Sequence, residues 1–270
     1  MSGYRLTILG KAVLIVFVVI FVYSISTLVG ATKIGSENIG GSLGSQDGSL
    51  VMAAEAVSII EEPILKVPVE EAYSYGENKV AFLTFDDGPT PSITPQILDI
   101  LEQYNVKATF CVIGYLVKEN PEILRDIAAF DHAIGIHTYS HRYKQIYSSS
   151  SYFLEEVEKS QELLKEVLGQ DFFTRIVRFP GGSFSVPDVF KEVLKDKGYV
   201  YVDWNTISGD GESNTMPAEK QLERLKDTAR GKKNLIILLH DSVTKQETVK
   251  ALPGIIEYLQ EQGYQFALLK

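Results

Sequence analysis

From about residue 79 to the end of the chain, short apolar runs rich in β-branched residues alternate with longer segments of helical periodicity. The short runs predict seven strands, at 80–85, 108–113, 133–137, 176–179, 200–203, 235–239 and 265–269. The longer segments predict helices over 95–104, 121–129, 152–168, 187–197, 217–229 and 247–262. Strands that are apolar on both faces and separated by helices form parallel sheets, so we expect an α/β fold.

The number of strand–helix repeats favours a closed or nearly closed barrel, with a doubly wound open sheet as the alternative. Polar side chains support the barrel, because they follow five of the predicted strands. They are Asp86 and Asp87, His137 and His141, Arg178, Asp203, and His240 with Asp241. In a parallel α/β barrel all carboxyl ends of strands open onto one face, so we expect a single site there.

His137 and His141 are spaced so that both imidazoles can bind one ion. One carboxylate from Asp86 and Asp87 would complete a set of two histidines and one acid, which suits catalytic zinc or another divalent transition metal. A closed structural zinc site needs four protein ligands, and the lone Cys111 lies elsewhere. The alternatives are hydrogen-bonded histidines and a turn formed by the Asp-Asp-Gly-Pro segment.

Neighbouring residues on a strand point to opposite sides, so the two adjacent aspartates are expected to differ in role. One can bind the metal while the other accepts a proton. Arg178 and Asp203 are interpreted in the same way: a buried guanidinium keeps a neighbouring carboxylate ionised, and a carboxylate next to His240 would favour the protonated imidazole of a general acid. Simple structural ion pairs are the alternative.

Aromatic residues near the same strand ends could stack on sugar rings, and Tyr139 and Trp204 are our candidates. Packing in the core or in loops is the alternative for both. Cys111 lies in the middle of a predicted strand, so we expect it to be buried and not to act as a nucleophile.

The N-terminal part has a different character. An unbroken apolar run over 12–22 continues, slightly diluted, to residue 29 and follows Arg5 and Lys11. About 18 apolar residues approach the length of a membrane-spanning helix, and the preceding positive charges place the N-terminus in the cytoplasm. A cleaved signal peptide is the alternative.

We therefore expect three parts: a membrane anchor over 1–30, a linker over 31–75 and a catalytic domain over 76–270 outside the cell membrane. Residues 31–50 are rich in Gly and Ser and resemble a flexible tether. Residues 51–75 are interpreted as more of the linker or as a segment that docks loosely on the domain.

Composition narrows the functional classes. The chain has 270 residues, of which 45% are hydrophobic and 23% charged, as in ordinary folded proteins. Its net charge of −9 argues against a nucleic-acid partner. A single cysteine excludes an intramolecular disulfide.

Five motifs occur in one order: Thr-Phe-Asp-Asp-Gly-Pro at 84–89, His-x-x-x-His at 137–141, Arg-x-Pro-x-Gly at 178–182, Asp-Trp at 203–204 and Leu-x-His at 238–240. In this order they resemble the polysaccharide deacetylase family, also called the NodB-homology domain or carbohydrate esterase family 4. The resemblance covers residues 79–270 and is strongest to membrane-anchored bacterial N-deacetylases of peptidoglycan or chitooligosaccharides. It implies a distorted TIM-like (β/α)7 barrel.

The resemblance also implies roles for single residues. Asp86 is similar to the general base, and Arg178 to the residue that orients it. One divalent ion, zinc or else cobalt, nickel or manganese, would be bound by Asp87, His137 and His141. His240 is similar to the general acid and Asp203 to its orienting partner, while the Gly181 N–H would hold the oxyanion. After the arginine, Phe179-Pro180-Gly181 departs from the family's usual Pro-Pro-Tyr or Pro-Pro-Arg, so the expected substrate groove differs.

Taken together, we expect a monomeric, metal-dependent hydrolase that removes acetyl groups from N-acetylglucosamine units of an extracellular polysaccharide, with peptidoglycan favoured because the domain is exported. O-deacetylation of xylan and an inactive glycan-binding module are the alternatives. A non-haem iron oxygenase is disfavoured by the alternating βα pattern. A glycosidase would need two carboxylates flanking one bond, for which only Asp86 with Asp203 remain candidates.

Overall fold

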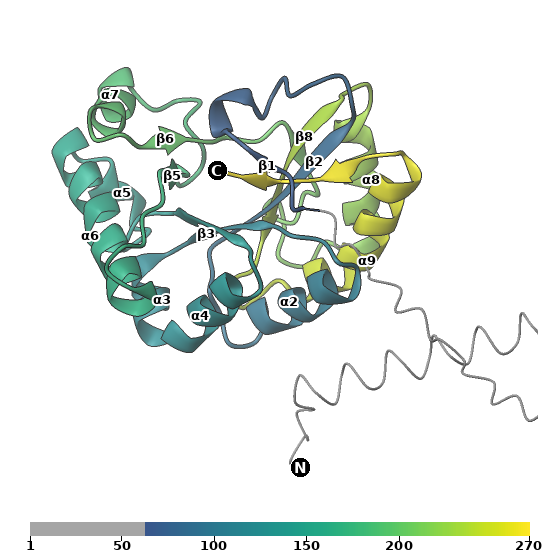
Figure 1. The fold of residues 1–270 in the computed structure, drawn as a ribbon, viewed down its shortest axis with the longest axis horizontal. Coiled ribbons are helices and arrows are strands. Elements are labelled where there is room, and N and C mark those ends of the chain that lie inside the picture. Colours follow the sequence, from purple (N-terminus) through teal and green to yellow (C-terminus); the bar gives the residue numbers. More distant parts are fainter. Residues whose placement is uncertain (1–62) are drawn as a thin grey trace, which may run out of the picture. The chain divides into compact units, whose positions relative to one another are not determined.

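A curled parallel sheet forms the centre of the computed structural model, which describes residues 63–270. Its strands follow the spatial order β6–β5–β4–β3–β2–β8–β7. The bounds are β2 (Val80–Asp86), β3 (Thr109–Val112), β4 (Ala133–Ile136), β5 (Ile176–Val177), β6 (Val200–Tyr201), β7 (Thr206–Ile207) and β8 (Asn234–His240). The result is a parallel half-barrel whose edge strands are β6 and β7, in agreement with the predicted α/β class and consistent with a distorted (β/α)7 barrel (Figure 1).

Helices cover the outer face of this sheet (Figure 1). They are α2 (Thr94–Gln103), α3 (Gly114–Glu119), α4 (Pro121–Ala129), α5 (Tyr143–Ile146), α6 (Ser150–Leu168), α7 (Asp188–Asp196), α8 (Ala218–Ala229) and α9 (Gln246–Glu261). Every residue of β2 is buried, and its side chains alternate between two hydrophobic clusters. Leu83 and Phe85 face the helices, whereas Val80 and Phe82 face the inner side. The central strand is therefore apolar on both faces, as the sequence predicts.

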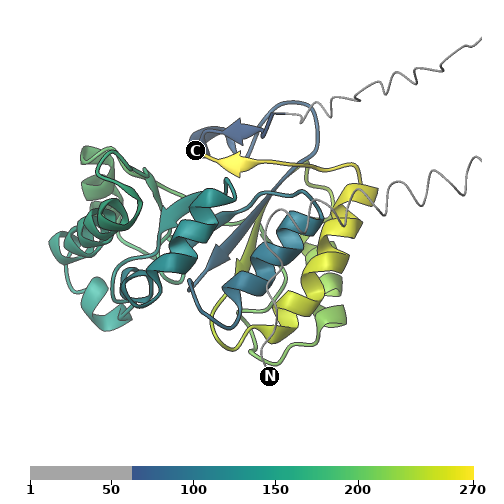
Figure 2. The same ribbon diagram turned by 60° about the horizontal axis from the view of Figure 1, so that its bottom comes forward.

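The inner side is covered by an N-terminal strap, defined here as residues 66–73. Its strand β1 (Lys66–Val67) pairs in parallel with β10 (Leu268–Leu269) at the end of the chain, as Figure 2 shows, and η1 (Val69–Glu71) follows. Val67 and Val69 are buried against Phe82 and Ile236. The strap precedes the predicted domain start at residue 76, and its valines belong to the hydrophobic core.

Some predicted elements differ from the observed ones. The expected strand at 265–269 is divided into β9 (Gln265–Phe266), which pairs with β2, and β10, which pairs with the strap. The sheet edge beside β8 is formed instead by β7, which the sequence did not predict. Strand β7, with two residues, and the short helices α3 and α5 carry too few positions for a periodic pattern to appear.

The predicted membrane anchor and most of the predicted linker lie outside the described residues. Within residues 63–270, none of the helices has both the length and the apolar character that crossing a bilayer requires. The described segment is one folded unit, and the site lies at the carboxyl ends of its strands.

Candidate active site

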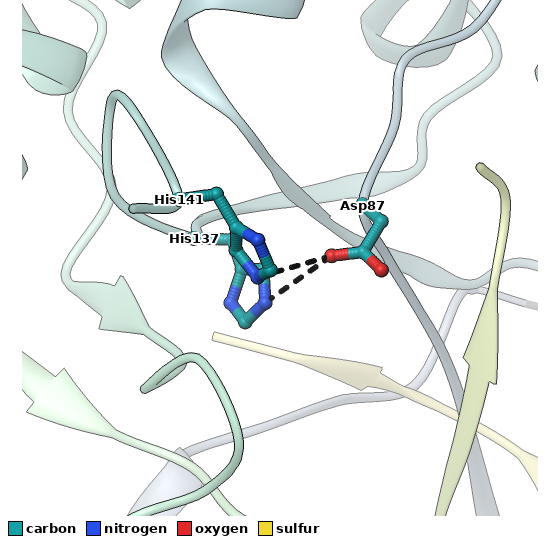
Figure 3. A group of neighbouring side chains, drawn as sticks. All are labelled: Asp87, His137 and His141. Atoms are coloured by element: carbon teal, nitrogen blue, oxygen red, sulfur yellow. Dashed lines mark ion pairs between the residues drawn. The ribbon is translucent and has the colours of Figure 1, made fainter. Parts of the chain in front are cut away.

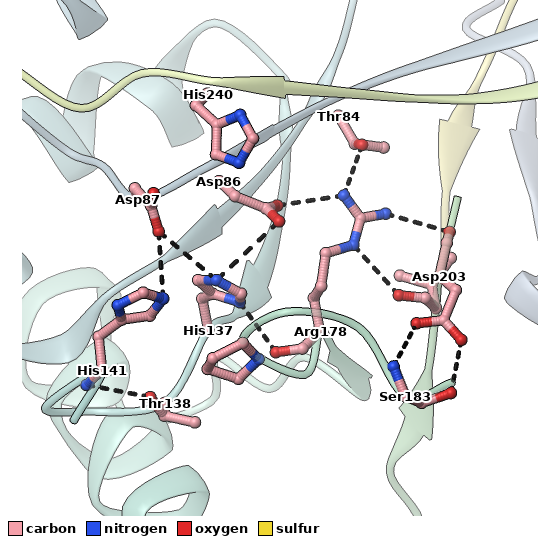
Figure 4. Close-up of polar contacts among 12 residues, drawn as sticks. Thr84, Asp86, Asp87, His137, Thr138, His141, Arg178, Ser183, Asp203 and His240 are labelled. Atoms are coloured by element: carbon pink, nitrogen blue, oxygen red, sulfur yellow. Dashed lines mark hydrogen bonds and ion pairs between the residues drawn. The ribbon is translucent and has the colours of Figure 1, made fainter. Parts of the chain in front are cut away.

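The register of the sheet brings together residues that are far apart in the sequence. Asp86 ends β2 and pairs directly with His240, which ends β8. Figure 4 shows both side chains near Asp87 and His137. A cavity of about 310 Å³ opens here, and its walls include these four residues together with His141. The predicted meeting of polar side chains at one end of the barrel is therefore observed.

Asp87, His137 and His141 form a compact group that we call the Asp–His–His cluster (Figure 3). One oxygen of Asp87, Oδ1, lies 3.5 Å from Nε2 of His137 and 3.3 Å from Nε2 of His141. One ligand atom from each residue falls within 4.8 Å of the others. Asp87 has a φ of 75° and His141 a φ of 54°, so local backbone turns direct both side chains into the group.

The donor set fits a divalent metal ion. Nδ1 of His137 lies 2.9 Å from the carbonyl oxygen of Arg178, which can only accept, so Nδ1 carries the proton. The lone pair of Nε2 is then free to face Asp87. Burial lowers the pKa of His137 to about 3, which keeps the imidazole in the neutral form that binds metals. Two imidazoles and one carboxylate with open positions are typical of catalytic zinc sites.

Asp86 is held by a fully buried arginine. Nη1 of Arg178 donates to Oδ1 of Asp86 at 3.1 Å and to Oγ1 of Thr84 at 2.6 Å. Nε of the same guanidinium donates to the Val202 carbonyl at 3.1 Å. Because these bonds fix the guanidinium plane, they also fix the carboxylate that it pairs with (Figure 4). The other oxygen of Asp86, Oδ2, lies 4.0 Å from Nε2 of His137.

The partner of His240 is Asp210, and the prediction of Asp203 for this role is wrong. Oδ1 of Asp210 lies 2.9 Å from Nδ1 of His240, and Oδ2 accepts from the His240 backbone N–H at 2.8 Å. Asp210 is itself fixed by Thr248, whose hydroxyl donates to Oδ2 at 3.0 Å. It follows β7 in a Ser-Gly-Asp-Gly segment. A carboxylate between two glycines just after a strand was the signal that could have found it.

Asp203 instead holds the loop that follows Arg178. Its carboxylate accepts from the backbone N–H of Ser183 at 2.8 Å and from the Ser183 hydroxyl at 2.5 Å. Its own backbone N–H donates to the hydroxyl of Tyr73 in the N-terminal strap at 3.1 Å. Asp203 lies beyond the end of β6, so its side chain is directed to this loop rather than across the barrel to β8.

The loop held by Asp203 contributes Gly181 to the cavity wall. Gly181 has a φ of 78°, a conformation that side-chain-bearing residues rarely adopt. Its N–H makes no hydrogen bond to any of the described residues. The predicted oxyanion donor is thus a free N–H at the cavity.

The two predicted aromatic residues are placed differently. Trp204 lines the cavity, with Phe184 packed edge-on against it at a centroid distance of 5.4 Å. Tyr139 does not line this cavity but a neighbouring one. Its ring packs under Lys159, whose Nζ lies 3.7 Å from the ring centroid. Tyr143, which sequence reasoning missed, takes a place in the wall and leaves 48% of its surface exposed.

Comparisons with known proteins show which family this chain resembles. The family model described as polysaccharide deacetylase matches residues 74–202. A peptidoglycan-N-acetylglucosamine deacetylase from Bacillus cereus is 34% identical over 195 residues, which cover 70% of this chain and 85% of that protein. The chain belongs to the polysaccharide deacetylase family. The resemblance inferred from the five motifs is thereby confirmed, and the relatives support hydrolytic deacetylase activity.

Solved structures of this family share the fold. A carbohydrate esterase family 4 enzyme from Streptococcus mutans has a TM-score of 0.69 and 36% identity, covering 75% of this chain and 90% of that chain. A family 4 pseudoenzyme from Bacillus anthracis has a TM-score of 0.62 and 25% identity, covering 71% of this chain and 64% of that chain. Since the family contains a pseudoenzyme, activity has to be argued from the side chains of the site.

Cys111, which lies outside the site, is placed as the sequence predicts. Cys111 on β3 is buried, and burial raises the pKa of its thiol well above the usual range. It therefore has the character of a packing residue. His132 accepts a hydrogen bond from the Ala108 N–H through Nδ1 and lies away from the cavity.

Proposed function

We propose that this chain is a metal-dependent N-deacetylase that removes acetyl groups from N-acetylglucosamine units of a cell-wall glycan, peptidoglycan in particular, and releases acetate. One observation carries the proposal: a fixed carboxylate, Asp86, and an imidazole paired with a carboxylate, His240, lie at the same cavity as the Asp–His–His cluster. Relatives named as peptidoglycan-N-acetylglucosamine deacetylases support the choice of substrate.

The chain's own residues would divide the chemistry among them. A divalent ion at the Asp–His–His cluster would polarise the acetyl carbonyl and lower the pKa of a water molecule. Asp86, fixed by Arg178, accepts the proton of the attacking water. The Gly181 N–H donates to the developing oxyanion, where a preorganised donor stabilises the transition state.

His240 then protonates the leaving nitrogen of the sugar through Nε2, because Nδ1 is taken by Asp210. Burial alone would lower the pKa of His240, but the hydrogen bond and charge of Asp210, with further charge from Asp86 and Asp87, outweigh burial and raise this pKa to about 9. The imidazole is therefore protonated near neutral pH. An amine is a poor leaving group without a proton, so N-deacetylation depends on this acid more than ester hydrolysis does.

We further propose that the enzyme acts outside the cell from a membrane anchor. The apolar run over 12–29 and the positive charges before it support this arrangement. Fractionation of cells that express the full chain with a C-terminal tag tests it. Recovery in the membrane fraction, with the tag open to external protease, is the expected result. A tag found in the cytosol would contradict the proposal.

The activity is tested by acetate release from a panel of glycans: N-acetylglucosamine oligomers, purified peptidoglycan and acetylated xylan. The purified chain is first treated with a chelator, and zinc, cobalt, nickel or manganese is then restored. Acetate from the N-acetylated glycans only after metal is restored is the expected result. Asp86→Asn should abolish it while the chain stays folded at the assay temperature.

Other outcomes would separate the alternatives. Acetate from xylan alone would identify an O-deacetylase. Glycan binding without acetate release by metal-loaded protein would identify a binding module and overturn the proposal. Full activity of Asp86→Asn would remove the assigned base.

A further inference from the structure

The loop between the two histidines of the Asp–His–His cluster has an unusual backbone. Thr138 has a φ of 64° and His141 a φ of 54°, and neither is glycine. For a β-branched residue such as threonine this conformation is particularly unfavourable. Such a conformation is strained and persists only where surrounding contacts hold it. The shape of the loop decides where the two imidazoles point, so the contacts that hold it bear on the cluster.

Glu156 of α6 supplies the strongest of these contacts. Its side chain is buried, with 5% exposed, and Oε2 accepts from the backbone N–H groups of Tyr139 at 3.1 Å and Ser140 at 2.6 Å. Hydrogen bonds to a carboxylate are roughly twice as strong as bonds between neutral groups. One buried acid therefore binds the two central peptide N–H groups of the loop.

The remaining contacts leave the loop little freedom. The hydroxyl of Thr138 accepts from the His141 N–H at 3.2 Å. The carbonyl groups of Thr138 and Tyr139 accept from the N–H groups of Gly114 and Tyr115 at 3.0 and 2.9 Å. These contacts are local or lie at the start of α3, whereas Glu156 is the charged group among them. Removing it would leave two N–H groups without their acceptor.

We propose that Glu156 is a positioning residue that sets the affinity of the Asp–His–His cluster for its divalent ion. It holds the 138–141 loop so that Nε2 of both histidines faces Oδ1 of Asp87. The inference rests on the metal site of the proposed function but not on the reaction or the substrate. Residues that orient metal ligands typically change metal affinity about 10–100-fold when they are replaced.

The same helix offers a matched control. Gln161 is also buried, with 2% exposed, and also holds a loop through two hydrogen bonds. Its Nε2 donates to the Phe172 carbonyl at 3.0 Å, and its Oε1 accepts from the Thr174 N–H at 3.1 Å. That loop leads into β5 and contributes nothing to the cavity. Replacing Gln161 removes a comparable set of contacts away from the cluster.

The experiment measures zinc affinity of the purified chain by competition with a chromophoric chelator, without substrate. Glu156→Ala is expected to weaken zinc binding by about 10–100-fold. Glu156→Gln keeps an acceptor oxygen but loses the charge, so it should recover part of the affinity. Gln161→Ala should lower the melting temperature and leave zinc affinity within about twofold of the parent chain, because its contacts lie outside the cluster.

Unchanged zinc affinity in Glu156→Ala would overturn the inference, as would an equal loss in Gln161→Ala. Should Glu156→Ala fail to fold, the intermediate affinity of Glu156→Gln decides, and parent-like affinity there would refute the role. If the parent chain binds zinc but releases no acetate, the proposed function is contradicted and the inference about Glu156 is not. If the parent chain binds no divalent ion, both the proposed function and the inference about Glu156 are contradicted.

Discussion

Replacing Asp210 by asparagine tests how the general acid is kept protonated. The change preserves size and an acceptor oxygen beside His240 Nδ1 but removes the charge. With Asp210 present, the pKa of His240 is raised to about 9. Without that charge the lowering effect of burial is no longer outweighed, so this pKa should fall to the ordinary 6.5 or below. At pH 8 the protonated fraction would drop from about nine-tenths to about 3%, a loss of about 30-fold in available acid.

The assay is acetate release from N-acetylglucosamine oligomers over pH 5–10, with metal in excess. The alkaline limb of kcat/KM should move to lower pH by about 2.5 units or more in Asp210→Asn, since the reaction needs protonated His240. A bound divalent ion adds positive charge and moves the alkaline limb to lower pH in both the parent chain and Asp210→Asn. The measured quantity is therefore the difference in pH between the two limbs. Asp203→Asn is the matched control and should leave the limb in place. A shift in Asp203→Asn with none in Asp210→Asn would refute the pairing.

Further predictions concern stability and reactivity. Arg178→Met leaves the buried Asp86 carboxylate without its cation and should lower the free energy of unfolding by about 3–5 kcal/mol in urea titrations; a loss under about 1 kcal/mol would show that Asp86 does not depend on it. Val67→Ala removes two buried methyl groups from the N-terminal strap and should cost about 2 kcal/mol in the same titrations, whereas a loosely docked linker would show no change. Cys111, at 1% exposure and with a raised pKa, should resist iodoacetamide at pH 8 until the chain unfolds, as mass spectrometry can follow; rapid labelling of folded protein would contradict its burial.

The main strands could be predicted because continuous apolar runs in the sequence indicate that they are buried. Strands β2 and β8 are seven residues long and apolar apart from their ends and Thr84, and the polar residues at their carboxyl ends mark the site. Once the strands are taken as parallel, Asp86, Asp87 and His240 must meet at one edge. The motifs and the fold class therefore follow from local pattern and a single topological rule.

Pairings between loops could not be predicted in the same way. Asp203 and Asp210 both follow short strands, and the choice between them as partner of His240 depends on the path of β7, two residues long. Tyr139 is adjacent to the site in sequence, yet the left-handed turn at Thr138 and the contacts with Glu156 direct its ring into another cavity. Such choices depend on backbone turns and tertiary contacts that leave no periodic signal.

The pairing of β1 with β10 has a consequence for biosynthesis. Lys66 and Val67 lie near the beginning of the described chain, and their partners Leu268 and Leu269 are among its last residues. Ribosomes deliver polypeptide in order, so the early segment has no partner until residues 268 and 269 have been synthesised. Until then the apolar side chains on the inner side of the sheet, Phe82 among them, remain exposed to water or to chaperones. Completion of this domain is thus a late event, governed by the arrival of its final residues.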